Sequence, residues 1–207
     1  MKGKFITFEG CEGVGKSRQI KLLQEYMDNN SVSYYLTREP GGSAISEKIR
    51  EIILDGKNVL MTDECEALLY AAARVQLLDE VLKPKLDAGE LVICDRFVDS
   101  SLAYQGYGRG LGFDFVAKIN DYALTRFTPD YTIFLKLPPE EAFKRKGGAD
   151  KADRLEQSGI EFHNKVYNGY LDLAEKVKER FIVIDASGSK YETHAKIVSA
   201  LKEKGIL

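Results

Sequence analysis

Five short apolar runs recur along the chain, and each has the length and composition of a buried β-strand. They cover Lys4–Glu9, Ser33–Thr37, Leu91–Cys94, Tyr131–Lys136 and Phe181–Ile184. Between them, apolar residues recur every three or four positions, which is the spacing of an amphipathic helix. Strands therefore alternate with helices, and no hairpin signal interrupts the alternation. This order is typical of an α/β fold with a parallel sheet covered by helices on both faces.

The stretches between the strands predict helices of ordinary length. Ser43 or Ser46 could cap one helix, which carries Ile49, Ile52 and Ile53. We expect the other helices at residues 18–27, 62–82, 115–125, 140–145, 156–179 and 191–204, with 62–82 ending near Pro84 and a glycine-rich loop at 106–112. Because no repeat, low-complexity tract or linker divides the chain, we predict a single domain over residues 1–207.

Composition narrows the class of protein. The chain has 207 residues, 44% hydrophobic and 30% charged, with a net charge of −2. This near-neutral balance gives no reason to expect a nucleic-acid or membrane partner, and no apolar run approaches the ~20 residues that span a bilayer. The first strand begins at Lys4, so we expect no signal peptide. The three cysteines lack disulfide or metal spacing, and we therefore expect a cytoplasmic protein.

The segment G-C-E-G-V-G-K-S at residues 10–17 lies between the first strand and the first helix. This is the context of a phosphate-binding P-loop. Its glycines let successive backbone N–H groups point at an anion, and the helix N-terminus adds the positive end of its dipole. Lys16 can reach the β- and γ-phosphates, and the Ser17 hydroxyl can bind Mg²⁺. The nucleotide-binding residues predicted here are Gly10, Cys11, Glu12, Gly13, Val14, Gly15, Lys16 and Ser17.

Further polar residues follow the other strands, where ligands of parallel sheets gather. R-E-P-G-G at residues 38–42 follows the second strand, and Asp95 and Arg96 follow the third. An aspartate there can hold Mg²⁺ through water, although alone it could equally be a helix cap. Motor and helicase ATPases place a glutamate after this aspartate, whereas a guanidinium suits a second phosphate group.

Arginines recur near the strand ends and in the segments that follow them: Arg38, Arg50, Arg74, Arg96, Arg109, Arg145 and Arg154. We interpret Arg18, Arg126 and Arg180 as solvated surface residues. Arg145 and Arg154 flank a basic, glycine-containing segment, which predicts a mobile lid at about residues 144–155. The alternative is an ordinary charged loop, but phosphoryl transfer needs several cations and the exclusion of water.

Four motifs occur in the order G-C-E-G-V-G-K-S, R-E-P-G-G, Y-A-A-A-R and D-R-F-V-D-S-S-L-A-Y-Q-G. With them the chain resembles the thymidylate (dTMP) kinase family from the first strand to the final helix. The second and fourth motifs are far more specific than the first. The resemblance implies a P-loop nucleoside monophosphate kinase fold with a five-stranded parallel sheet. It also implies transfer of the γ-phosphoryl group of ATP to dTMP, giving dTDP for dTTP biosynthesis, with Mg²⁺ and in a homodimer.

The resemblance also implies a role for individual residues. Lys16 and Ser17 correspond to ligands of the ATP phosphates and Mg²⁺, and Glu12 lies near the 3′-hydroxyl of the acceptor sugar. The dTMP-binding residues that it implies are Glu12, Arg38, Glu39, Pro40, Arg50, Tyr70, Arg74, Arg96, Ser101, Tyr104 and Gln105. The expected catalytic residues are Lys16, Glu12, Arg96, Arg145 and Arg154.

The base is expected at Tyr70 and Arg74, which lie four residues apart on one predicted helix. An aromatic ring stacks on any base, whereas arginine donates hydrogen bonds and so favours the O4 acceptor of thymine or uracil over the amino group of cytosine. The alternative is that both residues pack the helix against the sheet and that Arg74 pairs with a carboxylate. Tyr104 is expected to press on the deoxyribose where a ribose carries its 2′-hydroxyl.

The chain departs from the family pattern at four positions. Tyr70 stands where phenylalanine is usual, Cys11 replaces an apolar residue or proline, and Phe97 replaces tyrosine or histidine and so lacks a hydrogen-bonding group. Gly13 stands where one branch of the family carries a catalytic arginine. This chain resembles the branch in which the lid supplies the cation; the candidates are Arg145, Lys146 and Arg154, of which we favour Arg154 because it precedes a helix.

Two other functions are weighed against this one. A kinase for another nucleoside monophosphate or for shikimate shares the P-loop and the lid, but it does not need Tyr70, Arg74 and Tyr104 together. A regulatory GTPase needs an N-K-x-D segment to bind guanine, and the Asn164-Lys165 pair here is not followed by that aspartate. We therefore expect a dTMP kinase.

Overall fold

The computed structural model describes residues 3–146, 155 and 158–207. Within these residues, five parallel strands form one sheet in the order β2-β3-β1-β4-β5. The strands are β1 (Lys4–Glu9), β2 (Tyr35–Arg38), β3 (Leu91–Asp95), β4 (Tyr131–Lys136) and β5 (Phe181–Asp185). Each lies where an apolar run predicts it, because a strand covered on both faces needs apolar side chains on both sides. The expected parallel α/β sheet is confirmed.

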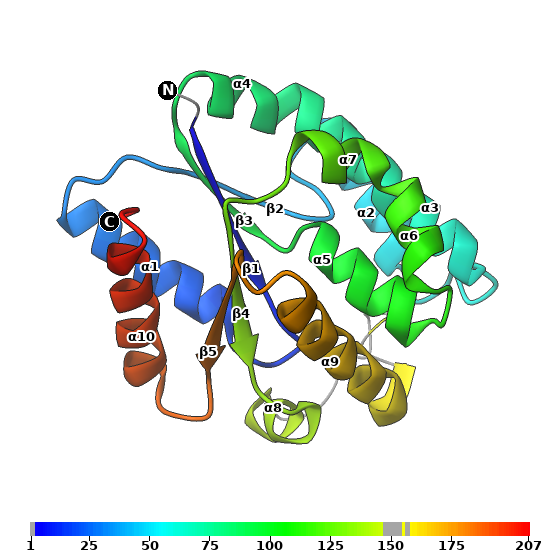
Figure 1. Cartoon of the computed structure of the whole chain (residues 1–207). Coiled ribbons are helices and arrows are strands. Elements are labelled where there is room, and N and C mark those ends of the chain that lie inside the picture. Colours follow the sequence, from blue (N-terminus) through cyan, green and yellow to red (C-terminus); the bar gives the residue numbers. More distant parts are fainter. Residues whose placement is uncertain (1–2, 147–154, 156–157) are drawn as a thin grey trace.

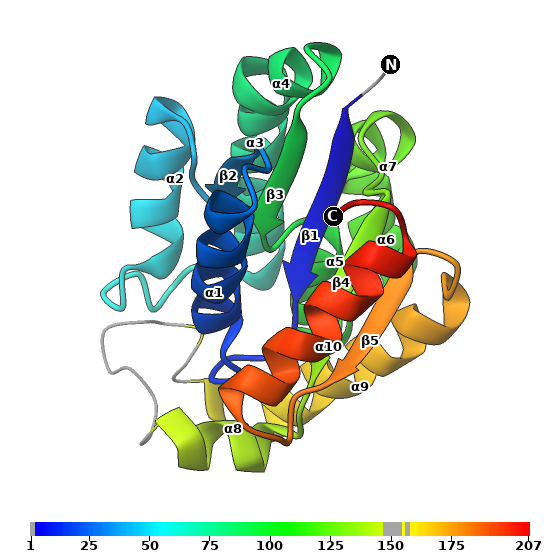
Figure 2. The same ribbon diagram turned by 90° about the vertical axis from the view of Figure 1, so that its left-hand side faces the viewer.

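Helices cover both faces of this sheet. They are α1 (Lys16–Asn29), α2 (Ala44–Leu54), α3 (Asp63–Leu77), α4 (Lys83–Asp87), α5 (Val98–Ser101), α6 (Phe113–Ile119), α7 (Asp121–Arg126), α8 (Pro139–Lys146), α9 (Gly159–Lys176) and α10 (Lys190–Glu203). In Figure 2, α1 and α10 lie in front of the sheet. In Figure 1, these two helices lie to its left and α3, α5, α6, α7 and α9 to its right. Side chains from both layers bury the strands: Phe8 and Ile93 are at most 1% exposed.

Two π-helical segments lengthen helices beyond the stretches that periodicity predicts. Residues Leu78–Leu82 (η1) join α3 to α4, so the helix continues past Pro84. Proline lacks the N–H that a regular helix uses at this position, and here it comes directly after the π-helical turn η1. Residues Leu102–Gly108 (η2) continue α5 into the stretch expected to be a glycine-rich loop. The single helix expected at 115–125 is instead divided at Asn120 into α6 and α7.

The carboxyl ends of the strands meet at the edge of the sheet beside α8, at the bottom of Figure 1. The register pairs Arg38 of β2 with Asp95 of β3, and Phe8 of β1 also with Asp95. The segments that follow β1, β2 and β3 therefore leave the sheet side by side. These are the glycine loop (residues 10–17), residues 39–43 and residues 96–97. Ser43 caps α2 by accepting a hydrogen bond from the Ser46 N–H, which resolves the alternative left open by the sequence.

Candidate active site

The glycine loop connects β1 to α1 in a conformation that needs its glycines. Gly10, Gly13 and Gly15 have φ angles of 142°, 77° and 95°, where L side chains are rarely found. A Cβ atom on Gly13 would lie 2.7 Å from the Ala142 carbonyl oxygen. Helix α8 therefore packs directly against the loop. An arginine at position 13 has no room unless α8 moves.

Lys16 is the first residue of α1 and turns back over the loop. Its side chain is buried, and its Nζ donates to the carbonyl oxygens of Gly10 and Cys11, each at 3.0 Å. An ammonium has three N–H groups, so one is left for an anion. Burial, and after it the positive charge of Arg96, lowers the pKa of Lys16. Burial raises the pKa of the Cys11 thiol to about 12, so this cysteine is protonated at neutral pH and is not a reactive thiolate.

Arg96 connects the glycine loop to the helical segment after β3. Its φ of 68° lies in the left-handed region, which costs a non-glycine residue of order 1–3 kcal/mol and marks functional sites. Its Nη1 donates to the Gly10 carbonyl at 3.1 Å and to the Ser100 hydroxyl at 3.2 Å. Its Nη2 donates to the Tyr104 hydroxyl at 3.2 Å and to the Glu12 carboxylate. The guanidinium is thus held on two sides by fixed acceptors.

Glu9, the last residue of β1, holds the turn that carries Arg96. Its side chain is fully buried and accepts hydrogen bonds from the N–H groups of Phe97 (2.7 Å) and Ser100 (3.3 Å). It also accepts from the hydroxyls of Ser100 (2.6 Å) and Tyr170 (2.7 Å). The carboxylate therefore caps the N-terminus of α5, where Phe97 has no capping side chain. Burial, together with the charge of Asp99, raises the pKa of Glu9 to about 7.

The R-E-P-G-G segment uses its charged residues in two ways. Arg38 forms a bidentate ion pair with Glu47, with hydrogen bonds of 2.6 and 3.0 Å, and the Gly42 N–H donates to the same carboxylate at 2.7 Å. The hydrogen bond from Arg38 lowers the pKa of Glu47 to about 2. Arg50 of α2 donates to the Pro40 carbonyl at 2.9 Å. The segment is thus tied to α2.

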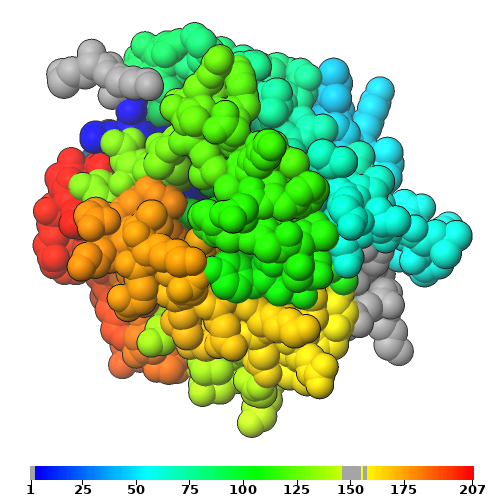
Figure 3. Space-filling view, turned by 45° about the vertical axis from the view of Figure 1, so that its right-hand side comes forward, coloured from blue at the N-terminus to red at the C-terminus, as the bar shows by residue number. Residues whose placement is uncertain are grey.

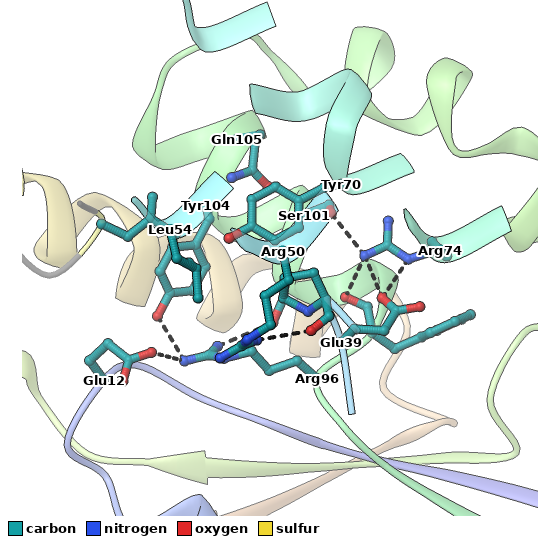
Figure 4. Close-up of a pocket in the computed structure, with 14 residues that line it drawn as sticks. Glu12, Glu39, Arg50, Leu54, Tyr70, Arg74, Arg96, Ser101, Tyr104 and Gln105 are labelled. Carbon is teal, nitrogen blue, oxygen red and sulfur yellow. Dashed lines mark hydrogen bonds and ion pairs between the residues drawn. The ribbon is translucent and has the colours of Figure 1, made fainter. Parts of the chain in front are cut away.

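One cavity, here called the inner cavity, lies between α2, α3 and η2 and measures about 540 Å³, counting the part open to solvent. This is the size range of small-molecule sites. Figure 4 shows Tyr70, Tyr104 and Leu54 around it, with the Arg96 guanidinium between Glu12 and Tyr104. Its other lining residues are Glu39, Pro40, Arg50, Arg74, Phe97, Ser100, Ser101, Gln105 and Leu155. All residues predicted to bind dTMP except Arg38 therefore line this one cavity.

Arg74 is almost fully buried in the wall of the inner cavity. It forms an ion pair with Glu39 at 2.7 Å, with side chains 1% and 4% exposed. It also donates to the Asn120 side chain, to the Ser101 hydroxyl at 3.0 Å and to the Phe97 carbonyl at 3.3 Å. Glu39 is thus the carboxylate partner that the packing alternative requires. Burial, opposed by Arg74, raises the pKa of Glu39 to about 7.

A second cavity, the glycine-loop cavity, adjoins the first. It is lined by Glu12, Gly13, Gly15, Lys16, Ser17, Arg18, Arg38, Glu39, Arg50, Asp95, Arg96 and Arg145. The two cavities share Glu12, Glu39, Arg50 and Arg96. Two guanidinium groups and two carboxylates therefore stand at the junction between an apolar pocket and a loop built for anions. Such an arrangement suits transfer of a group between two anionic molecules.

Two buried carboxylate oxygens of residues that line the glycine-loop cavity have no hydrogen-bond partner in the part of the chain that the structure describes: Asp95 Oδ1 and Glu39 Oε1. Oxygen ligands of this kind suit Mg²⁺, which keeps much of its water and binds to one or two carboxylates and phosphates. Among the described residues, no group of three or more histidine, cysteine, aspartate or glutamate side chains forms a metal cluster. The donor set fits a hydrated Mg²⁺ that accompanies a nucleotide better than a metal caged by protein.

Arg145, near the end of α8, lines both the glycine-loop cavity and a further cavity beyond the glycine loop. It donates to the Ala186 carbonyl at 2.6 Å and to the Ser187 carbonyl. The further cavity, here called the outer cavity, is formed by the glycine loop and residues 186–190. Arg154, the favoured lid residue, lies outside the described residues, as does the Lys146 side chain. The catalytic role of both arginines stays a prediction.

Several residues that complete the site are absent from the sequence prediction: Glu9, Glu47, Glu66, Ser100, Asn120 and Tyr170. Glu9 had a local signal, since it is an acidic residue at the end of a buried apolar strand. The interpretation of Arg180 as a solvated residue is wrong: it pairs with the buried Asp99 at 2.6 and 2.8 Å. Arg18 is exposed as expected, yet it lines the glycine-loop cavity. The Phe97 ring packs edge-on against Phe5, and the Arg74 guanidinium lies 5.4 Å from its centroid.

Comparison with known proteins agrees with this geometry. A family model described as thymidylate kinase matches residues 8–197. A thymidylate kinase of Caldanaerobacter subterraneus subsp. tengcongensis is 47% identical over 203 residues, which cover 98% of this chain and 97% of the relative. Another, of Lactobacillus acidophilus, is 48% identical over 207 residues, with 99% and 96% covered. A third, of Bacillus pumilus, is 47% identical over 206 residues, with 98% and 97% covered.

No helix within the described residues is long and apolar enough to cross a membrane. The family model covers most of the chain, and the relatives align over nearly their whole length. The match includes the glycine loop and every described residue of the inner cavity. The chain belongs to the thymidylate kinase family.

Proposed function

We propose that phosphoryl transfer takes place at the junction of the inner and glycine-loop cavities, with dTMP in the former and the phosphates of ATP in the latter. As a thymidylate kinase, the protein phosphorylates dTMP to dTDP with ATP as donor, in nucleotide biosynthesis. The observation that carries the placement is the set of residues common to both cavities. Both cavities are lined by the same four residues, Glu12, Glu39, Arg50 and Arg96. The donor and acceptor phosphates can therefore meet beside these residues.

On the donor side, the glycine loop acts as a P-loop. Its N–H groups and the N-terminus of α1 surround the β- and γ-phosphates. The unused N–H of Lys16 would bind the oxygens whose negative charge changes during transfer, which is electrostatic stabilisation of the transition state. The outer cavity beside Arg145 continues from the glycine loop and would hold the adenosine. ATP would then lie along the full length of the loop.

On the acceptor side, Arg96 and Arg50 would bind the dTMP phosphate. Arg96 is oriented by fixed acceptors on two sides, so little side-chain entropy remains to be lost on binding. Tyr70 would stack on the base, as predicted, and Tyr104 would lie against the deoxyribose. Its ring is held edge-on between Phe162 and Tyr170 at centroid distances of 6.0 and 6.3 Å. A rigid ring in this position would exclude an added 2′-hydroxyl sterically.

Mg²⁺ would be held by Ser17 and, through water, by Asp95. The unpartnered Asp95 oxygen supports this assignment. When bound, the ion would supply positive charge that stabilises the phosphates during transfer. The segment at about 144–155 remains proposed as a lid that supplies Arg154. Alanine variants of Arg145 and Arg154 with unchanged kcat would contradict that part.

We also propose that the protein acts as a cytoplasmic homodimer through α2 and α3. Ile45 and Ile52 on α2 are 51% and 48% exposed, and Leu68 and Val75 on α3 are 52% and 37% exposed. Each pair is seven residues apart and so lies on one side of its helix. Figure 3 shows the segment between the two helices (cyan) projecting from the surface. A mass of one chain in light scattering at micromolar concentration would contradict the dimer.

An assay of ADP formation with five acceptors tests the function. We expect dTMP to be the best substrate, followed by dUMP and then dCMP. Purine nucleotides should be excluded because their bases are too large for the cavity. A higher kcat/KM for any other acceptor would contradict the assignment of the inner cavity to dTMP.

A further inference from the structure

Glu66 is a buried carboxylate that the reaction itself does not use. It lies in the first turn of α3, and its side chain is 0% exposed. Arg109 compensates its charge, donating from Nε at 3.2 Å to one carboxylate oxygen and from Nη2 at 3.0 Å to the other. The second protein donor is the side-chain amide of Gln105, whose Nε2 lies 2.8 Å from Glu66 Oε1. A buried charge with this many fixed partners imposes an orientation on each of them.

Gln105 projects from η2 and lines the inner cavity. An amide side chain can present either its NH₂ group or its oxygen to a neighbour. An ionised carboxylate only accepts hydrogen bonds, so Glu66 requires the NH₂ group of Gln105 to face it. The amide oxygen must then point elsewhere. Among the described residues this oxygen accepts no hydrogen bond, and it is not one of the fully buried side-chain atoms that lack a partner. Figure 4 shows the amide beside the Tyr70 ring, where the base would stack.

We infer that Glu66 is a positioning residue for specificity: it locks the Gln105 amide so that the amide oxygen accepts a hydrogen bond from a pyrimidine that carries an N–H at ring position 3. This inference rests on the proposed placement of the acceptor base in the inner cavity. Thymine and uracil carry a hydrogen on N3, whereas N3 of cytosine is an acceptor. Cytosine would therefore set two acceptors against each other at the cavity wall. Leaving a buried polar group unpaired in this way corresponds to roughly 10- to 100-fold in selectivity.

The contribution of Glu66 differs from the one expected of Arg74. Arg74 offers a donor, whereas a locked Gln105 offers an acceptor, and both residues line the inner cavity. A donor alone would not exclude a base that turned over to present another acceptor. Donor and acceptor together match one edge of an imide, in the same way that paired side-chain contacts discriminate bases in nucleic acids.

The test is E66Q. Glutamine has the same shape and can still accept from Arg109, but it can also donate, so it no longer dictates the orientation of the Gln105 amide. We expect the ratio of kcat/KM for dTMP to that for dCMP to fall roughly tenfold or more, with the KM for ATP unchanged. D63N is the matched control. Asp63 is the other carboxylate paired with Arg109, at 3.3 Å and 44% exposed, and it does not contact Gln105. The ratio of kcat/KM for dTMP to that for dCMP in D63N should therefore equal that of the parent chain.

A second probe reports on the hydrogen bond itself. The 5′-monophosphate of 3-methylthymidine lacks the N3 hydrogen, and by calorimetry it should bind the parent chain more weakly than dTMP does. In E66Q this difference should narrow. If E66Q fails to fold, Q105M removes the acceptor from the other side and should lower the same ratio. In a double-mutant cycle the two effects should not add.

The outcomes distinguish a failure of the role inferred for Glu66 from a failure of the proposed dTMP kinase function. If E66Q lowers kcat/KM for dTMP and dCMP by the same factor, Glu66 is only structural and the inference is overturned, while the dTMP assignment stands. If the ratio of kcat/KM for dTMP to that for dCMP is as low in D63N as in E66Q, the inference is also overturned. Loss of a negative charge near Arg109 would then explain the lower selectivity without the Gln105 amide. If the parent chain itself does not prefer dTMP, it is the proposed function that fails.

Discussion

Replacing Arg74 by alanine has a cost that the structure allows us to work out. Its pair with Glu39 is buried, with 1% and 4% of the two side chains exposed. In R74A, Glu39 would remain as a buried carboxylate without a cation, and breaking a buried pair from one side costs about 3–5 kcal/mol. For a chain of this length, each kcal/mol lowers the melting temperature by roughly 2–4 °C. We therefore expect R74A to melt roughly 6–20 °C below the parent chain.

The loss should depend on pH through Glu39. Burial already raises the pKa of Glu39 to about 7 with Arg74 in place, and loss of the cation should raise it further. Because this pKa is higher in the folded than in the unfolded state, the folded chain binds more protons and loses stability as the pH rises above about 4.5. We expect stability to fall more steeply with rising pH in R74A than in the parent chain. The difference in melting temperature should be largest near pH 8 and smaller near pH 5.

Activity then separates the two roles of Arg74. In R74M/E39Q both charges are removed, which is far less costly than removing one. If Arg74 only joins α3 to its neighbours, this double variant recovers the melting temperature and keeps the parent ratio of kcat/KM for dTMP over dCMP. If Arg74 also binds the base, the ratio stays roughly 10- to 100-fold lower. Loss of Glu39 affects both acceptors alike, so the ratio isolates the base.

Thermal unfolding followed by circular dichroism and a coupled assay of ADP formation provide these measurements. An R74A melting temperature within about 2 °C of the parent at pH 8 would refute the energetic reasoning. If R74M/E39Q keeps the parent ratio of kcat/KM for dTMP to that for dCMP, Arg74 does not distinguish the bases.

Three further predictions concern single residues. K16A should lower kcat by roughly 10²- to 10³-fold with an unchanged far-ultraviolet spectrum; near-normal turnover would contradict the donor site. Burial raises the pKa of Glu9 to about 7, so its contribution to stability is complete below about pH 4.5 and is lost as the pH rises to about 7. The free energy of unfolding of E9Q should therefore depend less on pH, and a dependence as steep as that of the parent chain would count against the raised pKa of Glu9. Y104A should narrow the difference in kcat/KM between dTMP and its ribonucleotide counterpart in the ADP assay, and an unchanged preference would mean that Tyr104 does not contact the sugar.

Much of the fold could be predicted because its signals are local. Each strand is a short apolar run, and the loop after β1 needs glycine at positions whose φ angles are positive. The break at Asn120 was not predictable in this way, because the apolar spacing continues through it. The π-helical turns in η1 and η2 likewise leave the apolar pattern almost unchanged.

The partners of the site residues could not be predicted, because they come from distant parts of the chain. Glu9 accepts a hydrogen bond from Tyr170, which lies 161 residues further on, and Arg180 pairs with Asp99 across 81 residues. In sequence, Arg180 is one cation among many charged residues of α9 and its end. Only the packing of β4 and β5 brings it to a buried carboxylate. The motifs therefore located residues that line the two cavities, but not the residues that hold those side chains in place.

The central claim is that the inner and glycine-loop cavities form one continuous site in which the two phosphates meet. A single molecule in which adenosine and thymidine are joined 5′ to 5′ by a chain of five phosphates would span both cavities. We predict that calorimetry gives one molecule bound per chain, with an affinity roughly 10²- to 10⁴-fold above that of either nucleotide, and that ATP and dTMP each displace it. Binding no tighter than that of ATP or dTMP alone, or displacement by only one of them, would contradict the claim.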